Sequence, residues 1–216
     1  MEIDLFKGVY PETKRDTKKV GQVKTDKQIN LAKQYGWEYF DKKGICYNGY
    51  SYDGRWIPVA KKFIKHYKLK PNSKILDIGC AKGFMIHDMK KLIPGITVKG
   101  IDISNYAIEN VIESMKDNVM VADARDLPFR DNSFDVVISI TTVHNLDRDD
   151  CIRSLREIER VSRRKSFVTV DAYRNEDERT AMLAWNLTAK TILKVEEWID
   201  LFNEAGYTGD YYWFMP

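Results

Sequence analysis

The sequence contains few of the residues that stabilise small secreted or metal-binding domains. Its three cysteines are odd in number, widely spaced and without a Cys-x-x-Cys pair: Cys46, Cys80 and Cys151. A disulfide framework and a zinc site are therefore not expected, and the thiols fit a reducing, cytoplasmic compartment. The three histidines show no metal-ligand spacing either: His66, His87 and His144. We expect no metal.

Long apolar runs and a large excess of one charge are also absent. No run approaches the roughly 20 residues of a membrane-spanning helix, and residues 1–19 have no apolar segment typical of a secretory signal. With 35 basic and 32 acidic residues, the net charge is +3. A dedicated nucleic-acid-binding protein usually has a stronger basic excess, so we expect neither a membrane nor a nucleic-acid partner. The sequence leaves the oligomeric state open.

The length and composition fit one globular domain with an extension. A chain of 216 residues buries about seven-tenths of its unfolded surface on folding. The hydrophobic fraction of 44% and the charged fraction of 31% exclude a disordered or collagen-like chain. Residues 1–56 are predicted to form an N-terminal arm and lid segment, with a short helix from Thr25 to about Tyr35. Residues 57–216 are predicted to form the main domain.

Within the main domain, short apolar runs alternate with segments of helical periodicity. Strands are predicted over residues 73–78, 97–103, 118–124, 134–141, 166–172 and 209–215. Helices are predicted over residues 58–67, 84–93, 106–115, 149–161, 178–190 and 194–206. This alternation favours a doubly wound, mostly parallel α/β sheet with right-handed crossovers.

The first predicted strand enters a turn of small residues that suits a bound ligand. Residues 76–83 read Leu-Asp-Ile-Gly-Cys-Ala-Lys-Gly, so the backbone can approach a ligand closely. The Gly-x-Gly-x-x-Gly spacing of nicotinamide-binding loops fails, because Ala81 and Phe84 stand at its second and third glycine positions. Asp77, at the strand end, would repel a pyrophosphate but suits an ammonium or sulfonium group. The alternative is that Asp77 only caps the turn.

Two further acids follow the next two predicted strands. Asp102 ends the strand over 97–103, where a carboxylate can accept both hydroxyls of a ribose. Its alternative role is a charge at the N-terminus of the next helix, which the helix dipole favours. Asp123 follows the third strand, where an adenine amino group would need an acceptor, although its segment also reads as a plain polar loop.

Four motifs in this order resemble those of class I S-adenosylmethionine-dependent methyltransferases, of the small UbiE-like (methyltransferase type 11) family. They are residues 76–83, 100–104, 122–129 and 133–137, and the resemblance runs over roughly residues 57–207. It implies a Rossmann-like fold, methyltransferase activity, S-adenosylmethionine as cofactor and S-adenosylhomocysteine as product. Two features depart from the family: Ala81 replaces a usual glycine, and the ten residues after Gly206 leave little room for the usual terminal hairpin.

The resemblance implies cofactor contacts from ten residues: Asp77, Gly79, Ala81, Lys82, Gly83, Asp102, Ile103, Asp123, Ala124 and Ile140. The loop over 79–83 would surround the methionine part, with Asp77 near its amino group. Asp102 would hold the ribose, and Ile103 would pack on the adenine. Asp123 would meet the adenine amino group, and Ile140 would border the site of methyl transfer.

The aromatic segment before residue 57 is the candidate lid over the acceptor substrate, and it comprises Tyr47, Tyr50, Tyr52, Asp53, Arg55 and Trp56. Aromatic rings attract a sulfonium group and exclude water, and Arg55 could bind a carboxylate or phosphate. The alternative is that these rings cover the sheet as core. Asp171, Tyr173 and Arg174 lie at the end of the fifth predicted strand and just after it, at the same edge of the sheet. The predicted substrate-binding residues are Tyr50, Tyr52, Arg55, Trp56, Tyr173 and Arg174.

His144 is the candidate general base, because it follows the central fourth strand and histidine titrates near neutral pH. Its alternative is a helix cap or a packing role. The leading function is methyl transfer to a small, anionic or hydroxylated metabolite, by O- or N-methylation. An RNA methyltransferase is a second enzyme interpretation, and a non-catalytic S-adenosylmethionine-binding regulator or partner subunit is the alternative of another class.

Overall fold

The computed structural model of the chain describes residues 1–9, 25–43, 50–163 and 165–215. Its strands are β1 (Lys74–Ile78), β2 (Thr97–Asp102), β3 (Val119–Val121), β4 (Val136–Ile140), β5 (Ser166–Tyr173), β6 (Leu193–Lys194) and β7 (Asp210–Phe214). Its helices are α2 (Asp26–Ala32), α3 (Trp37–Phe40), α4 (Trp56–Tyr67), α5 (Phe84–Leu92), α6 (Asn105–Glu109), α7 (Arg148–Val161), α8 (Glu176–Trp185) and α9 (Val195–Ala205), with 3-10 turns η1 (Glu113–Asn118) and η2 (Val143–Asn145). None of these helices is long and apolar enough to cross a bilayer.

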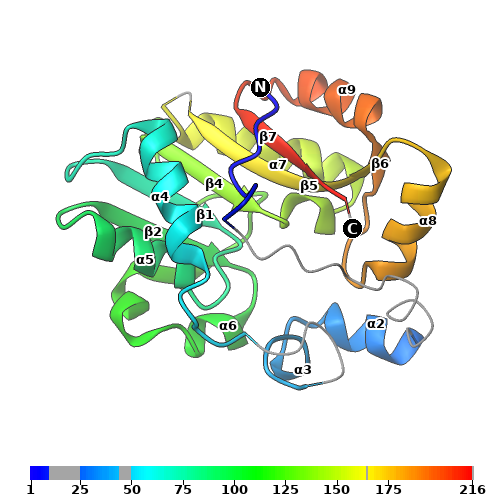
Figure 1. Cartoon of the computed structure of the whole chain (residues 1–216), viewed down its shortest axis with the longest axis horizontal. Helices are drawn as coiled ribbons and strands as arrows, with labels where there is room; N and C mark the ends of the chain where they lie inside the picture. The colour runs from blue at the N-terminus through cyan, green and yellow to red at the C-terminus, as the bar shows by residue number, and fades with distance from the viewer. Residues whose placement is uncertain (10–24, 44–49, 164, 216) are drawn as a thin grey trace.

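The strands form one parallel sheet, which confirms the predicted α/β fold (Figure 1). Over the described ranges the order is β3-β2-β1-β4-β5, and both β6 and β7 pair with β5. Every pair of strands is parallel. The chain builds outward from β1 in one direction and from β4 in the other, so the switch point lies where these two strands end side by side. Open α/β sheets bind ligands at this place.

Alternating side chains of the sheet pack under helices on its two faces. In β1, Leu76 and Ile78 belong to the core cluster that contains α7 and α9, while Ile75 belongs to the cluster that contains α4 and α5. Successive side chains of a strand point to opposite faces, so each strand contributes to both cores. All eight residues of β5 are buried, as expected of a strand covered on both faces.

One predicted helix, over residues 106–115, is divided in the structure. Helix α6 ends at Glu109, and η1 begins only at Glu113. Between them, the main-chain N–H of Ile112 donates to the carbonyl of Lys82 at 3.0 Å instead of continuing the helical pattern. A contact with the loop after β1 therefore overrides the local helical periodicity.

The prediction after β5 also differs from the structure. The helix predicted over 178–190 ends at Trp185, because Asn186 has an extended backbone and its side-chain oxygen accepts two of the following main-chain N–H groups. The two-residue strand β6 was not predicted, since two residues are too few to show a periodic pattern. The terminal hairpin usual in the family is replaced by the single parallel strand β7.

The first nine residues lie beside the last strand, far away in sequence (Figure 1). The main-chain N–H of Ile3 donates to Tyr211 at 2.9 Å, and the N–H of Tyr211 donates to Met1 at 3.0 Å. Leu5 is buried in the core cluster that contains α4. These residues cover the edge of β7 that does not pair with β5, so the described part of the predicted arm packs against the main domain.

Candidate functional site

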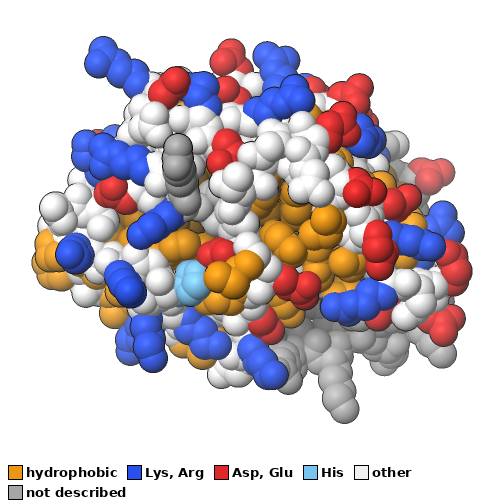
Figure 2. Space-filling view, turned by 90° about the horizontal axis from the view of Figure 1, so that it is seen from above, with side chains coloured by type: hydrophobic (Ala, Val, Ile, Leu, Met, Phe, Trp, Pro, Cys, Tyr) orange, Lys and Arg blue, Asp and Glu red, His pale blue; other side chains and the backbone are white. Residues whose placement is uncertain are grey.

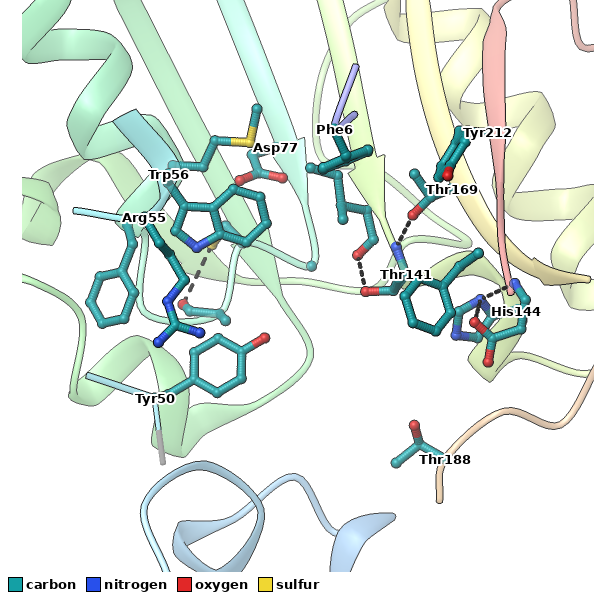
Figure 3. A pocket seen from close by; sticks show the side chains of 18 of the residues that line it. Phe6, Tyr50, Arg55, Trp56, Asp77, Thr141, His144, Thr169, Thr188 and Tyr212 are labelled. Atoms are coloured by element: carbon teal, nitrogen blue, oxygen red, sulfur yellow. Dashed lines mark hydrogen bonds and ion pairs between the residues drawn. The ribbon is translucent and has the colours of Figure 1, made fainter. Parts of the chain in front are cut away.

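A cavity of about 660 Å³ lies at the carboxyl ends of β1, β4 and β5 (Figure 3). Its inner side is formed by the loop after β1, by residues 140–144 and by β5. Residues 4–7, residues 50–56 and residues 185–188 supply further walls. The parallel sheet brings these distant segments to one edge, at the switch point between β1 and β4.

The loop after β1 has a shape that requires glycine. Gly79 and Gly83 have φ angles of 77°, in the left-handed region. A Cβ atom on Gly79 would lie 2.0 Å from Oγ1 of Thr142, so the loop packs directly on the residues after β4. Ala81 has a φ angle of 48°. At this position, where the family usually has glycine, the backbone of Ala81 is therefore also in the left-handed region.

Two buried carboxylates lie at this loop. Asp77 lines the cavity, and burial together with repulsion from Asp102 raises its pKa to about 7. Asp102 accepts hydrogen bonds from the main-chain N–H groups of Ala81 and Ser104, each at 2.9 Å. Burial raises the pKa of Asp102, against the effect of these hydrogen bonds. The fold thus brings the two predicted acids together, although Asp102 is not among the residues that line the cavity.

Lys82 joins the loop to the N-terminal helices. Its Nζ lies 2.5 Å from Oδ1 of Asp41 and donates to the carbonyl of Tyr50 at 3.2 Å. The hydroxyl of Tyr106, in α6, donates to the other Asp41 oxygen at 2.6 Å. Figure 1 shows α2 and α3 together at this side of the molecule. The predicted cofactor residue Lys82 therefore lines the cavity, and its charge is paired with Asp41, which follows α3.

The residues predicted to contact adenine lie outside the cavity. The carboxylate of Asp123 accepts from Nε of Arg125 at 2.9 and 3.0 Å and from Nη2 at 2.6 Å, and this pairing lowers its pKa. Ile103 is 56% exposed. Ala124 packs against the core cluster that contains α7. Gly83, which is also outside the cavity, begins helix α5 as its N-cap.

Four of the predicted lid residues line the cavity, namely Tyr50, Asp53, Arg55 and Trp56. Figure 3 shows Tyr50, Arg55 and Trp56 together on one side, with His144 on the opposite side. The guanidinium of Arg55 is paired with Asp53, through Nε at 2.8 Å and Nη2 at 2.5 Å. Tyr47, which was also predicted to belong to the lid, lies outside the described residues, as does Cys46.

The other predicted substrate residues do not line the cavity. The Tyr52 hydroxyl donates to the buried carboxylate of Asp88, on α5, at 2.6 Å, and this hydrogen bond raises the pKa of Tyr52 to about 12. Tyr173 is buried as the last residue of β5. Arg174 donates from Nη1 to the sulfur of Met215 at 3.0 Å. The pattern of apolar and polar residues in the sequence could not show that these three side chains lie outside the cavity.

His144 lies in η2, immediately after β4, and lines the cavity. The main-chain N–H of Asp171 donates to Nδ1 of its ring at 3.0 Å, and Oδ1 of Asp171 lies 3.6 Å from the same nitrogen. Burial lowers the pKa of His144, against the opposing effect of Asp171. The side-chain amide of Asn186 donates to the Asp171 carboxylate, so β4, β5 and the segment after α8 meet at this wall.

Sequence reasoning missed several residues of the cavity. Thr169 is a polar residue within the fully buried strand β5, and this pattern was the signal that could have found it. Phe6, Asn186 and Thr188 carry no comparable signal, because only the tertiary structure brings their segments to the cavity. Within the described ranges, no group of three His, Cys, Asp or Glu residues is placed to hold a metal ion.

Comparisons with known proteins identify a related family. Residues 76–170 match the family described as Methyltransferase domain. A tRNA (carboxymethyluridine(34)-5-O)-methyltransferase of Arabidopsis thaliana is 34% identical over 148 residues, which cover 67% of this chain and 34% of that protein. A demethylmenaquinone methyltransferase of Thermotoga maritima is 28% identical over 147 residues, which cover 64% of this chain and 62% of that protein. The chain thus spans less than two thirds of the length of either relative.

Solved structures give the same result for the fold. A SAM-dependent methyltransferase from Aquifex aeolicus has a TM-score of 0.51 at 18% identity, and the similarity covers 89% of each chain. The matched family, the related sequences and the parallel sheet with its loop after β1 together show that the chain belongs to the class I S-adenosylmethionine-dependent methyltransferases, whose cofactor is S-adenosylmethionine.

Proposed function

We propose that this chain transfers the methyl group of S-adenosylmethionine to a small metabolite that carries a hydroxyl or an anionic group, by O- or N-methylation. The observation that supports a small acceptor is the cavity of about 660 Å³ between the β1 loop and β5. Pockets for small ligands usually have volumes of roughly 300–1,000 Å³. The cavity combines residues of the predicted cofactor loop with a separate aromatic and polar wall, as a two-ligand site requires.

The described residues fit the methionine part of the cofactor. Gly79, Ala81 and Lys82 line the cavity, where Gly79 packs so closely on Thr142 that no Cβ would fit, and the Asp77 carboxylate is suited to an ammonium group. S-adenosylmethionine supplies a methyl group that its sulfonium centre makes electrophilic. In this proposal the methionine part lies against Gly79, Ala81 and Lys82, with Asp77 at its amino group and Ile140 beside the transferred methyl. Gly83, outside the cavity, would act by setting the start of α5.

The residues that would bind the nucleoside part of the cofactor do not line the cavity. Asp102 would bind the ribose hydroxyls, and the exposed face of Ile103 would pack on the adenine ring. Asp123 and Ala124 would lie at the adenine edge. Because Asp123 already pairs with Arg125, an adenine amino group would have to share that carboxylate with the guanidinium.

On the acceptor side, the chain positions the substrate and excludes water. Tyr50 and Trp56 would close the cavity on one side, and Arg55 would bind an anionic group of the acceptor. Tyr52 would act indirectly, by holding the lid segment to α5 through Asp88. Since Tyr173 and Arg174 are not on the cavity wall, we leave them out of the proposed substrate site.

The proposal is tested by incubating the purified chain with methyl-labelled S-adenosylmethionine and a panel of small hydroxylated and carboxylated metabolites. We expect a labelled product together with S-adenosylhomocysteine. Asp102→Ala should weaken S-adenosylhomocysteine binding about ten- to a hundredfold, because charged hydrogen bonds contribute roughly 1.5–3 kcal/mol. The matched control is Asp117→Ala at an exposed aspartate. Cofactor binding without transfer to any acceptor would favour the non-catalytic regulator.

A tRNA substrate is the second candidate, supported by the 34% identity to the Arabidopsis tRNA methyltransferase. The nearly balanced charge, 35 basic against 32 acidic residues, supports the small acceptor. Figure 2 shows that side chains of both signs are present on the face opposite α2 and α3. Bulk tRNA therefore belongs in the same assay. Label transfer to tRNA, with binding that weakens steeply as salt increases, would replace the small-metabolite proposal.

A further inference from the structure

The ring of His144 is held in one protonation pattern by the main chain of β5. Its Nδ1 accepts a hydrogen bond from the N–H of Asp171 at 3.0 Å. A main-chain N–H can only donate, so Nδ1 must present its lone pair. The neutral ring therefore carries its proton on Nε2.

This pattern leaves no nitrogen to serve as a base. Nε2 already carries a proton, and a second proton on Nδ1 would face the donating N–H of Asp171. The ring is 3% exposed, so water cannot easily stabilise an imidazolium. Nε2–H is thus the group that the ring can offer to a ligand, and His144 is on the cavity wall.

The position of the ring is fixed as well. The carbonyl of His144 accepts hydrogen bonds from the main-chain N–H groups of Lys190 and Thr191, both at 3.0 Å. The Thr191 hydroxyl donates to the carbonyl of Leu146 at 2.7 Å. The turn η2 is therefore joined to β5 through the ring and to the segment before β6 through the backbone, so the direction of Nε2–H is preorganised.

We propose that His144 is a fixed hydrogen-bond donor in the acceptor compartment, and that it selects methyl acceptors which present an oxygen lone pair, such as a carboxylate, phenolate or carbonyl. The inference rests on the proposed methyl-transfer function of the same cavity. It replaces the role of general base for His144 with a role in substrate recognition. An acceptor that offers only an ammonium group to this position would place a donor against a donor.

The charged groups around the ring do not reverse this assignment. Asp171 on β5 is the acid in direct contact, and its effect on the pKa of His144 opposes that of burial. Asp147, before α7, and Lys190 are paired with each other at 3.0 Å. On α7, burial raises the pKa of the Cys151 thiol to about 12, so this thiol is neutral.

The protonation pattern is tested by nitrogen-15 NMR of the histidine rings in the full chain bound to S-adenosylhomocysteine. We expect an unprotonated Nδ1 and a protonated Nε2 from about pH 5.5 to 8.5, on both sides of the usual histidine pKa of about 6.5. The His144 signals are identified with His144→Gln. A proton on Nδ1, or a titration near pH 6.5, would overturn the proposal.

The selection of oxygen acceptors is tested in the same sample with a matched pair of probes. Benzoate should shift the Nε2–H resonance of His144, whereas benzylamine at the same concentration should not. The absence of a shift at saturating benzoate, or equal shifts with both probes, would refute the selection. These measurements need no methyl transfer, so they separate a failure of this inference from a failure of the proposed function.

Three variants then distinguish a donor from a base, with the panel member that the wild-type chain methylates. His144→Gln places an N–H near the position of Nε2 but has no basic nitrogen, and its KM should rise less than that of variants without this donor. His144→Ala and His144→Asn lack that donor and should raise KM about ten- to a hundredfold with a smaller change in kcat. An equal loss of about 10²–10⁴ in kcat for all three variants would restore the general base. Thermal melts show whether each variant is folded.

Discussion

Cofactor binding is predicted to weaken as the pH falls below 8, because Asp77 must lose its proton to bind an ammonium group. Burial and the nearby Asp102 raise the pKa of Asp77 to about 7 in the unliganded chain. A bound ammonium stabilises the carboxylate and lowers that pKa. Binding and deprotonation are therefore linked, and higher pH favours the complex.

The magnitude follows from the raised pKa. If the pKa is about 7 in the free chain and well below 6 in the complex, about ten-elevenths of the carboxyl groups must be deprotonated at pH 6 before binding, against about one-eleventh at pH 8. The affinity at pH 6 should then be about tenfold lower than at pH 8, which is about 1.4 kcal/mol. Binding at pH 7 should release about half a proton.

Isothermal titration calorimetry with S-adenosylhomocysteine measures both quantities, in buffers of different ionisation enthalpy. Asp77→Asn should bind more weakly and lose the pH dependence between 6 and 8. Adenosine, which lacks the amino-acid part, serves as the matched ligand and should show no such dependence in the wild-type chain. An affinity that is constant between pH 6 and 8, or the same slope with adenosine, would refute the assignment of Asp77.

Three substitutions test the construction of the site by thermal melts. Gly79→Ala should lower stability by about 1–3 kcal/mol, because its φ angle is 77° and its Cβ would collide with the side chain of Thr142, just after β4; an unchanged melting temperature would contradict this packing. Ala81→Gly should be neutral or stabilising by up to about 1 kcal/mol, since it relieves a left-handed backbone, whereas the control Ala107→Gly in α6 should destabilise. Tyr52→Phe should cost about 1–3 kcal/mol, because the buried carboxylate of Asp88 loses a hydrogen bond at 2.6 Å. Hydrogen exchange over residues 50–56 that stays as slow as in wild type would show that this bond does not hold the lid segment.

Local sequence patterns were enough to predict the sheet and the position of the loop after β1. Strand and helix periods differ, so their alternation from residue 73 onward indicated a parallel α/β sheet, which the structure confirms. The small residues at 79–83 follow the first strand directly, and the fold of any such unit places its loop at the ligand edge. These features depend on neighbours in sequence, which explains why they could be predicted without coordinates.

Other features were predicted wrongly or not at all because they depend on contacts across the chain. The helix predicted over 106–115 breaks where the N–H of Ile112 bonds to the loop after β1, and the pairing of residues 1–3 with β7 was not predicted. Phe6 and Thr188 enter the cavity from segments with no ligand-binding pattern.

The sequence thus determines which residue types lie at the carboxyl ends of the strands. The tertiary structure determines their pKa values and tautomers. Asp77 and His144 could be assigned to the ends of β1 and β4 from periodicity alone. Burial beside Asp102 decides that the pKa of Asp77 lies near 7, and the N–H of Asp171 decides which nitrogen of His144 carries its proton. A side chain's pKa and tautomer depend on desolvation and on donors that lie close in space, and only the folded chain brings those groups together.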